Sequence, residues 1–439
     1  MSDNLEEQVQ LLEARAAQIR GLLPFASRAF VMEFAGTPKS GKSTSVEAIR
    51  HFFTRHDFRV HVLSERAADC PIPMKGHLFF NTWCAASMLA ELLANVETET
   101  DLIIIDRGLF DALVWLTLQR RRGELTQPEA DIIESFLLLD RWRTLIDLAI
   151  VMSVQADEAL ARESGPRITS KGGSIMNPDV LSAINDAVTE ATEKYGKKFR
   201  AFIDHPTTGD EPKASNIRLA NKVLDTLEGF LNPEVLVVQR KHVEALSAKN
   251  GGAFGAEITD EVISCIESHA EFMLRALAEQ NKDYVQIVPA GVLRLEKEVF
   301  VFERKEADPK YRLYGKTTLW QGTHVTKQDA PSRSQLIGAA LADRISRDLF
   351  VSREFPTRAI GYCWDRDDDK SSPHFGLIYE ITIDNPDTAV DLRKKAFRKR
   401  RGHNLSGQFL SVTQLIESEE QLDLESWSTT ILKKFLVKE

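Results

Sequence analysis

Residues 29–44 read AFVMEFAGTPKSGKST, and this stretch decides the fold of the first half of the chain. It opens with a short apolar run that contains Phe and Val, which predicts a buried β-strand. Residues Gly36 to Ser43 then match the pattern G-x-x-x-x-G-K-[ST] at every fixed position. An amphipathic helix through Phe53 is expected to follow. A strand, a glycine-rich loop and a helix in this order predict a phosphate-binding loop.

The residue types of this loop explain how it would hold a nucleotide. Glycines let backbone N–H groups curl around phosphate oxygens, and the start of the following helix adds the positive end of its dipole. The Lys42 ammonium suits the β- and γ-phosphates, the Ser43 hydroxyl suits Mg²⁺, and Thr44 can hydrogen-bond phosphate. We therefore expect ATP and Mg²⁺ as cofactors. The expected nucleotide-binding residues are Gly36, Lys39, Ser40, Gly41, Lys42, Ser43 and Thr44.

Apolar runs of strand length alternate with helical segments from residue 29 to residue 231. After the first strand, the expected strands are 59–64, 102–105, 148–154 and 201–205. This alternation predicts a P-loop α/β domain, in which a parallel sheet is covered by helices on both faces. Asn232-Pro233 then interrupts this pattern and indicates a domain boundary. The expected parts are an N-terminal helix at 1–28, the P-loop domain at 29–232 and a second domain at 233–439.

The second domain is predicted to be α+β, because strands of antiparallel character are mixed with few helices. A strand at 234–239 is expected to precede a largely helical segment at 257–280. Further strands are expected at 285–289, 298–304, 313–320, 358–364 and 376–383, with one helix at 335–350.

Residues 4–23 are expected to form one helix with a narrow apolar seam. The seam residues follow a 4-3-4-3-4 spacing and are Leu5, Val9, Leu12, Ala16, Ile19 and Leu23. A seam this short fits a helix that packs on its own domain, and it also fits a homodimer contact.

The composition is that of an ordinary globular protein. Of its 439 residues, 43% are hydrophobic and 28% are charged, and the net charge is −9. This acidic balance argues against a general nucleic-acid coat protein. No apolar run approaches the roughly 20 residues of a spanning helix, so no membrane partner is expected. The four cysteines form no CxxC pair, and the expected location is a reducing cytoplasm.

Charged residues at two strand ends narrow the expected function. Asp106 follows a buried apolar run, where it could hold Mg²⁺ or cap the next helix. Asp106-Arg107 resembles the Asp-Arg motif of thymidylate and deoxynucleoside kinases, in which the Arg positions the acceptor. Glu65 resembles the strand-end Glu of deoxynucleoside kinases, which takes a proton from the sugar 5′-hydroxyl. A salt bridge from Glu65 to Arg66 or Arg107 is the alternative.

The resemblance covers about residues 29–231. Residues 162–177, with Gly pairs and basic side chains, resemble the lid of nucleotide kinases, in which Arg162 and Arg167 would reach the transferring phosphoryl group. An ordinary solvated loop is the alternative. The helix expected at 76–96 carries aromatic side chains that would line a base pocket or pack in the core. The catalytic residues implied are Lys42, Glu65, Asp106, Arg107, Arg162 and Arg167, with Ser43 and Asp106 as the metal-binding pair.

The second half resembles a Nudix hydrolase. The resemblance rests on a strand, a Gly-x-His loop, a helix and a late strand, at 299–304, 320–325, 335–350 and 407–410. A working Nudix helix clusters Glu residues for a divalent metal. Here Arg344 and Arg347 stand at glutamate positions and Asp348 keeps an acidic side chain. Because cations repel a divalent metal, we expect no Nudix hydrolysis, and a nucleotide ligand or a protein partner instead.

These observations together predict a nucleoside or nucleotide kinase that depends on ATP and Mg²⁺, with a second domain that tunes it. A nucleotide-sensing ATPase switch is the first alternative, since the N-terminal seam and the fused second domain would suit it. A polynucleotide 5′-hydroxyl kinase is another, supported by the basic run Arg393–Arg401, although a solvated loop explains that run as well.

Overall fold

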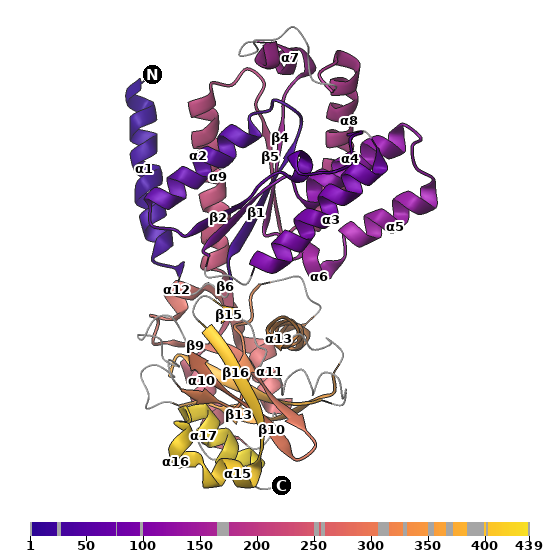
Figure 1. Cartoon of the computed structure of the whole chain (residues 1–439). Helices are drawn as coiled ribbons and strands as arrows, with labels where there is room; N and C mark the ends of the chain where they lie inside the picture. Colours follow the sequence, from indigo (N-terminus) through magenta and orange to yellow (C-terminus); the bar gives the residue numbers. More distant parts are fainter. Residues whose placement is uncertain are drawn as a thin grey trace. The chain divides into compact units, whose positions relative to one another are not determined.

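The computed structural model divides the chain into two compact units, Met1–Leu231 and Asn232–Glu439 (Figure 1). The structure describes residues 2–23, 28–75, 77–96, 100–164, 175–249, 254–255, 260–305, 316–327, 332–349, 355–365, 372–383, 399–400 and 403–437. The basic run Arg393–Arg401, apart from the backbone of 399–400, lies outside these residues. Among the described helices, none combines the length and the apolar character that crossing a bilayer requires.

The first unit is built on a five-stranded sheet in the order β2-β3-β1-β4-β5, and every pairing in it is parallel. Its strands are β1 (Phe30–Gly36), β2 (Val60–Leu63), β3 (Leu102–Asp106), β4 (Leu148–Ser153) and β5 (Ala201–Pro206). All residues of the central strand β1 are buried. The register pairs Phe34 with both Asp106 and Ile150, so the carboxyl ends of β1, β3 and β4 lie at one edge of the sheet.

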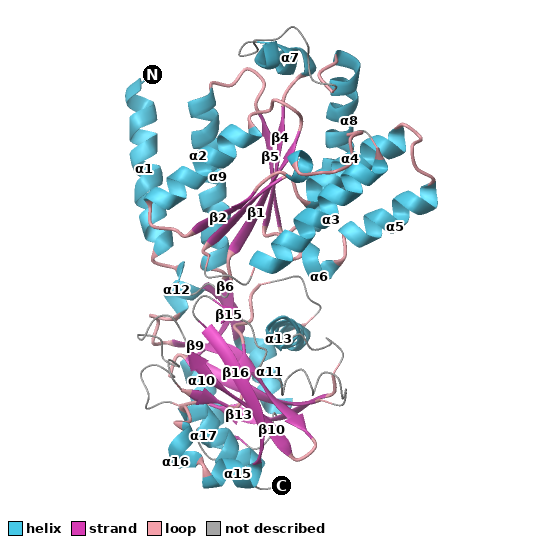
Figure 2. Ribbon diagram, in the orientation of Figure 1, coloured by secondary structure: helices cyan, strands magenta, loops and turns pink. Residues whose placement is uncertain are grey.

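Helices cover both faces of this sheet (Figure 2). The described helices of the unit are α1 (Ser2–Arg20), α2 (Lys42–Arg55), η2 (Arg66–Ala68), α3 (Leu78–Asn95), α4 (Leu109–Arg121), α5 (Gln127–Leu137), α6 (Asp140–Arg143), α7 (Ala156–Ser164), α8 (Pro178–Tyr195), η3 (Gly196–Lys198) and α9 (Pro212–Leu231). Side chains alternate along β1, so Val31 packs with α3, α4 and α8 while Met32 packs with α1, α2 and α9. Burial on both faces explains why these strands read as continuous apolar runs.

The apolar seam of the N-terminal helix is used within its own unit. Leu12, Ala16 and Ile19 of α1 are buried in the core formed with α2 and α9. An ion pair reinforces this contact, since Arg15 Nη2 lies 2.6 Å from Asp225 Oδ1 on α9. Of the two interpretations of the seam, the structure therefore places it against its own domain.

The second unit contains a mixed sheet. Its path runs β15-β16-β10-β9-β14-β13-β7, with β11 on β10, β12 and β6 on β9, and β8 on β6. The strands are β6 (Glu234–Gln239), β7 (Phe254–Gly255), β8 (Ala270–Leu274), β9 (Tyr284–Leu295), β10 (Glu298–Lys305), β11 (Thr317–Thr318), β12 (Gln321–Gly322), β13 (Thr357–Cys363), β14 (His374–Thr382), β15 (Lys399–Arg400) and β16 (His403–Ser411). The pairing of β14 with β9 is parallel, and the other pairings described are antiparallel.

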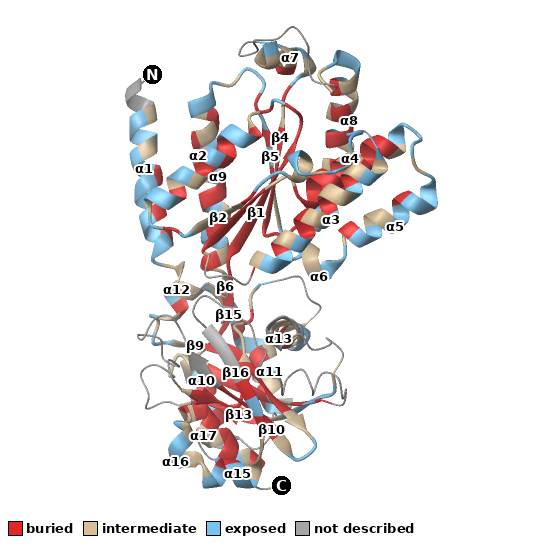
Figure 3. Ribbon diagram, viewed as in Figure 1, coloured by how far each residue is buried: buried red, intermediate tan, exposed pale blue. Residues whose placement is uncertain are grey.

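Helices lie on both faces of this second sheet as well (Figure 3). They are α10 (Arg240–Lys249), α11 (Asp260–His269), α12 (Arg275–Ala278), α13 (Arg333–Leu349), α15 (Val412–Glu417), α16 (Glu419–Leu422), α17 (Ser426–Ile431) and the π-helical η4 (Leu432–Leu436). Neighbouring strand residues again face opposite ways, since Tyr362 packs with α10 and α11 while Cys363 packs with α15 and α17.

One sequence expectation for this unit holds for helices α11 and α12 but is wrong between them. The segment 257–280 was expected to be largely helical, but Ala270–Leu274 forms strand β8, which pairs with β6. Its residues are good helix formers, so the local sequence favours a helix and the long-range pairing with β6 overrides that preference. The strand expected at 313–320 is described only from residue 316 onward, where β11 spans Thr317–Thr318.

Candidate functional site

The glycine loop follows β1 at the carboxyl edge of the first sheet. Gly36 has a φ of 124°, and a Cβ atom built there would lie 1.9 Å from the carbonyl oxygen of Met152 on β4. Gly41 has a φ of 90°, also in the region that favours glycine. The two fixed glycines of the motif are therefore required by backbone conformation, and at Gly36 also by the close approach of β4.

Hydrogen bonds hold this loop against the ends of the two neighbouring strands. Thr37 N donates to Met152 O over 3.0 Å, and Thr37 Oγ1 accepts from Val154 N over 3.0 Å. On the other side, Thr207 Oγ1, just after β5, donates to Ser40 O over 3.0 Å. The loop is thus fixed by β4 and β5, which is the preorganisation that a phosphate-binding site needs.

The Lys42 side chain turns inward and is buried within the loop. Its Nζ atom donates to Gly36 O at 3.1 Å and to Thr37 O at 2.5 Å. Burial, together with the nearby Arg107 cation, lowers the pKa of Lys42 to about 7. Ser43 and Thr44 follow in the first turn of α2 and are exposed, so their hydroxyls are accessible at the helix N-terminus.

Arg107 stands directly after β3 and links three parts of the carboxyl edge. Its Nε lies 2.9 Å from Glu65 Oε1, beyond the end of β2, and its Nη1 lies 2.9 Å from Asp111 Oδ1 on α4. Nη1 also donates to Gly36 O of the glycine loop over 3.4 Å. Burial alone would lower the pKa of Arg107, but Asp111 and Glu65 outweigh it and the pKa is raised. The alternative of a Glu65 salt bridge to Arg107 is therefore present in the structure.

The backbone at Arg107 is strained, since its φ of 64° is left-handed for a residue other than glycine. Its amide donates to Phe34 O over 2.9 Å, which holds the turn to β1. Strained backbone of this kind persists where the surroundings enforce it, and it concentrates at functional sites.

Asp106 is the last residue of β3 and is partly buried beside the glycine loop. Burial raises its pKa, with Arg107 acting in the opposite direction. Within the described part of the chain, its Oδ1 atom is buried without a hydrogen-bond partner. A carboxylate oxygen that lacks a partner and an accessible Ser43 hydroxyl are a donor set that fits Mg²⁺.

Glu33, in the middle of β1, is a buried acid that the sequence interpretation overlooked. Its Oε1 accepts from Gly108 N at 3.0 Å and from Asp111 N at 2.9 Å, so it caps the N-terminus of α4. Burial raises the pKa of Glu33 to about 7. A single acidic residue in an otherwise apolar strand was the signal that could have marked it.

Asp111 is the second residue that sequence reasoning missed, and Glu33 holds its backbone in place. Besides pairing with Arg107, its carboxylate accepts from Gly36 N at 3.2 Å and from Trp115 Nε1 at 3.1 Å. It therefore couples the start of α4 to the glycine loop. Its spacing of four residues from Arg107, just before and just inside the expected helix, could have suggested the pair.

Arg162 lies at the end of α7 and contacts the glycine loop from the β5 side. Its Nη1 donates to Lys39 O over 3.1 Å, and its Nη2 donates to Thr207 O over 2.7 Å. Lys39 itself pairs with Glu163, also on α7, at 2.6 Å. Arg162 thus ties α7 to the loop, and its expected contact with a phosphoryl group stays a prediction. Arg167 lies outside the described residues.

The aromatic residues of α3 differ in exposure. Phe79 is 63% exposed and packs edge-on against His77, while Phe80 and Trp83 are half-buried. In the second unit, Arg344 lies on α13, and the side chains of Arg347 and Asp348 are outside the described part.

Comparison with known proteins gives distant similarities. No protein-family model matches the chain. Protein YmaB of Bacillus subtilis is 23% identical over 175 residues, which is 39% of this chain and 81% of that protein.

Three similar solved structures each cover just under half of the chain. Tm1382, a presumed Nudix hydrolase, has 15% identity and a TM-score of 0.34, and covers 46% of this chain and 100% of its own. Deoxyadenosine kinase from M. mycoides with bound dCTP has 16% identity and a TM-score of 0.34, with coverages of 45% and 100%. Thymidylate kinase from Candida albicans has 11% identity and a TM-score of 0.33, with coverages of 46% and 94%.

Proposed function

We propose that the first unit is a kinase that transfers the γ-phosphoryl group of ATP to a nucleoside or nucleotide. The observation that carries this proposal is the convergence at one sheet edge of the glycine loop with Glu65, Asp106 and Arg107. A phosphate-binding loop alone serves many chemistries. A carboxylate and a guanidinium beside that loop add a base for the acceptor hydroxyl and a cation that can orient the acceptor.

The donor side of the proposed site is formed by the loop itself. Backbone N–H groups of the loop and the start of α2 would bind the phosphates. The Lys42 ammonium, which now donates to Gly36 O and Thr37 O, would turn to the β- and γ-phosphates. Ser43 and Asp106 would hold Mg²⁺, which neutralises charge on the phosphate oxygens when bound.

The acceptor side is formed by Glu65 and Arg107. In transfer to a hydroxyl, the acceptor oxygen forms a bond to the γ-phosphorus, the bond from that phosphorus to ADP breaks, and Glu65 takes the hydroxyl proton. Arg107 is held within reach of both groups, because it contacts Glu65 and Gly36 at once. It would orient the acceptor and stabilise charge on the phosphoryl group.

One observation favours a second candidate, a nucleotide-dependent switch. The Glu65 carboxylate is already paired with Arg107, and Lys39 and Arg162 connect the glycine loop to α7. If the Glu65–Arg107 pair persists when ATP binds, no acceptor would be phosphorylated. Binding of the nucleotide at the loop would instead change the contacts that Lys39 and Arg162 make between the loop and α7. A polynucleotide kinase gains no support of this kind, since its basic run lies outside the described residues.

ADP formation, measured with and without each nucleoside and nucleoside monophosphate, separates the two candidates. A kinase forms ADP faster when its acceptor is added, and Glu65→Gln removes that stimulation. Glu193→Gln, an exposed acid on α8, is the matched control and should behave like the wild type. ADP formation that no acceptor changes would overturn the kinase proposal and favour the switch.

A further inference from the structure

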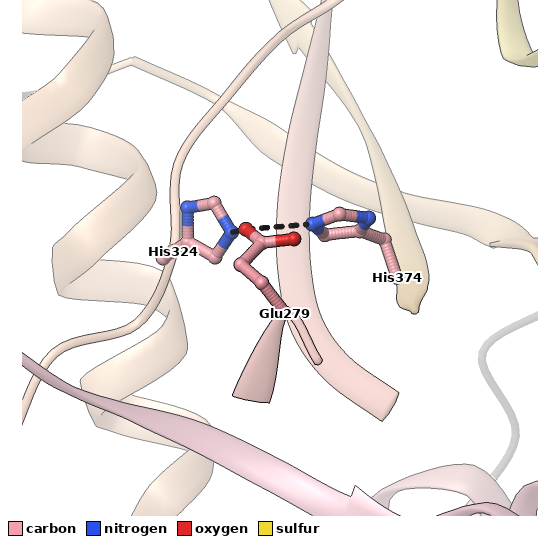
Figure 4. A group of neighbouring side chains, drawn as sticks. All are labelled: Glu279, His324 and His374. Carbon is pink, nitrogen blue, oxygen red and sulfur yellow. Dashed lines mark ion pairs between the residues drawn. The ribbon is translucent and has the colours of Figure 1, made fainter. Parts of the chain in front are cut away.

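Three side chains from separate parts of the second unit converge on one point (Figure 4). Glu279 follows α12, His324 follows β12, and His374 is the first residue of β14. Their ligand atoms all lie within 4.8 Å of one another. His374 Nε2 is 3.6 Å from Glu279 Oε1, and His324 Nε2 is 4.0 Å from the same oxygen.

Strand β9 fixes the two histidines relative to each other. It pairs with β14 on one side, with His374 opposite Gln286, and with β12 on the other, with Gly322 opposite Ala290. His324 lies two residues beyond Gly322, so both imidazoles are set by the same sheet. Their ring centroids are 5.5 Å apart. Sites on strands hold ligand geometry more firmly than sites on free loops.

We propose that Glu279, His324 and His374 bind a divalent first-row transition metal ion. Imidazole nitrogen and carboxylate oxygen are ligands of Zn²⁺, and two histidines with one carboxylate also bind non-haem Fe²⁺. Three protein ligands leave coordination positions for water or an oxygen of another ligand. None of these three ligands lies on helix α13, the helix that corresponds to the metal-binding helix of Nudix hydrolases. This proposal is independent of the function proposed for the first unit.

The spacing of the ligand atoms suits a metal better than direct hydrogen bonds. Around Zn²⁺ with bonds of about 2.1 Å, tetrahedral ligand atoms are separated by about 3.4 Å. The two measured N–O distances, 3.6 and 4.0 Å, are close to that value. They exceed the 2.7–3.2 Å of ordinary hydrogen bonds. A small contraction would bring the three atoms to metal-binding distances.

A buried polar group beside the cluster supports the same conclusion. Gln286 is fully buried on β9, and its Nε2 lies 3.5 Å from His374 Nε2. Among the described residues, Gln286 Oε1 and His374 Nδ1 are buried without hydrogen-bond partners. Buried polar atoms of this kind are costly unless something binds them. A metal-bound water could donate to Gln286 Oε1, the atom of this amide that lacks a partner.

One neighbouring cation opposes metal binding. Arg275 Nε lies 3.8 Å from Glu279 Oε1. Burial alone would raise the pKa of Glu279, but His374, Arg275 and Gln286 outweigh it and the pKa is lowered. Ion pairing among these residues is the competing explanation for the cluster. Ion pairing alone predicts that no stoichiometric metal ion binds, and the number of bound metal ions can be measured.

The test uses the full chain, stripped with a chelator and then titrated with Zn²⁺ by calorimetry and with Co²⁺ by visible absorption. We expect one high-affinity equivalent in the wild type. Glu279→Gln and His374→Asn should each weaken it by more than the roughly 10- to 100-fold that loss of an outer partner costs. Metal content after purification distinguishes zinc from iron, and either metal supports the proposal.

The matched control is His242→Ala. His242 and His269 stack at 3.9 Å on the same unit and represent an adventitious surface histidine pair. This variant should keep the high-affinity equivalent. Circular dichroism confirms that each variant is folded, and Zn²⁺ should raise the melting temperature of the wild type but not that of His374→Asn. The proposal is overturned if no stoichiometric equivalent binds, or if binding survives in His374→Asn and disappears in His242→Ala.

Discussion

Arg107 Nε lies 2.9 Å from Glu65 Oε1, so the residues that follow β2 and β3 are joined by an ion pair at the edge of the sheet. The Arg107 side chain is 18% exposed and that of Glu65 is 42% exposed. The guanidinium is therefore the fixed partner, and the carboxylate is the partner that solvent or an acceptor can reach. This relationship places the proposed base beside the glycine loop, because Arg107 also contacts Gly36.

Replacement of Glu65 by Gln should slow phosphoryl transfer without changing ATP binding. Loss of a general base typically lowers kcat by about 10²- to 10⁴-fold. The KM for ATP should stay within about twofold, because the ion pair that the structure describes for Glu65 is with Arg107 and not with a residue of the glycine loop. Steady-state kinetics with a saturating acceptor measures both quantities. A Glu65→Gln enzyme with the kcat of the Glu193→Gln control would contradict the assigned role.

ATP binding should take up protons at pH about 8 through Lys42. The pKa of Lys42 is lowered to about 7 by burial, so its amine is largely neutral at that pH. Phosphate oxygens favour the charged form and raise the pKa, so up to about one proton is bound per nucleotide. Calorimetry in buffers of different ionisation enthalpy measures the uptake. Lys42→Arg, which keeps a permanent charge, should abolish it, and equal uptake in both proteins would refute the assignment.

Glu33→Gln should remove a pH dependence of stability. The pKa of Glu33 is raised from 4.5 to about 7, so the folded state holds a proton that the unfolded state releases between these values. Its contribution is therefore present below pH about 4.5 and is lost as the pH rises to about 7, a difference of about 3 kcal/mol. Hydrogen exchange of β1 amides at several pH values measures the free energy of unfolding and its dependence on pH.

The Gln side chain cannot ionise but keeps an acceptor for Gly108 N and Asp111 N. The free energy of unfolding of Glu33→Gln, measured by exchange, should therefore lack the decline that the wild type shows between pH about 5 and 7. Profiles that are parallel across this range would show that Glu33 does not titrate there.

Arg28→Ala should destabilise the first unit strongly. Arg28 and Asp147 form a buried bidentate pair, with distances of 2.6 and 2.7 Å, that joins the start of β1 to the start of β4. Removing one partner leaves a buried charge, which costs about 3–5 kcal/mol. Arg200, 3.3 Å from Asp147, offsets part of this, so we expect about 3 kcal/mol.

The matched control is Arg15→Ala, whose partner Asp225 is exposed, and it should cost about 1 kcal/mol or less. Hydrogen exchange of β1 and β4 amides reports both variants in the full chain. Equal effects of the two substitutions would contradict the structural role of the buried pair.

The glycine loop and the parallel strands were predictable because their signals are local. Gly36, Gly41 and Lys42 stand at fixed spacing, and a strand buried on both faces reads as a continuous apolar run. Asp106, Arg107 and Glu65 could be placed at one edge because parallel strands end together. The Glu65–Arg107 pair could be named only as one alternative, since side-chain orientation after a strand end depends on the turn.

Residues that act across long sequence separations escaped the sequence interpretation. Glu33 and Asp111 are 78 residues apart and meet only because β1 and α4 pack together. Glu279, His324 and His374 share no local motif, and only the packing of α12 and the strands in the second unit brings them together. Strand β8 was missed for a related reason, since its local preference is helical and its partner β6 lies far away in the chain.

The most direct test of the central claim is transfer of label from γ-labelled ATP to a panel of nucleosides, nucleoside monophosphates and a 5′-hydroxyl oligonucleotide. Lys42→Ala is the inactive comparison, and Lys213→Ala, an exposed lysine at the start of α9, is its matched control. The account predicts label in one nucleoside or nucleotide class, retained in Lys213→Ala and reduced at least about 100-fold in Lys42→Ala. Label that appears only as free phosphate, whatever acceptor is added, would contradict it.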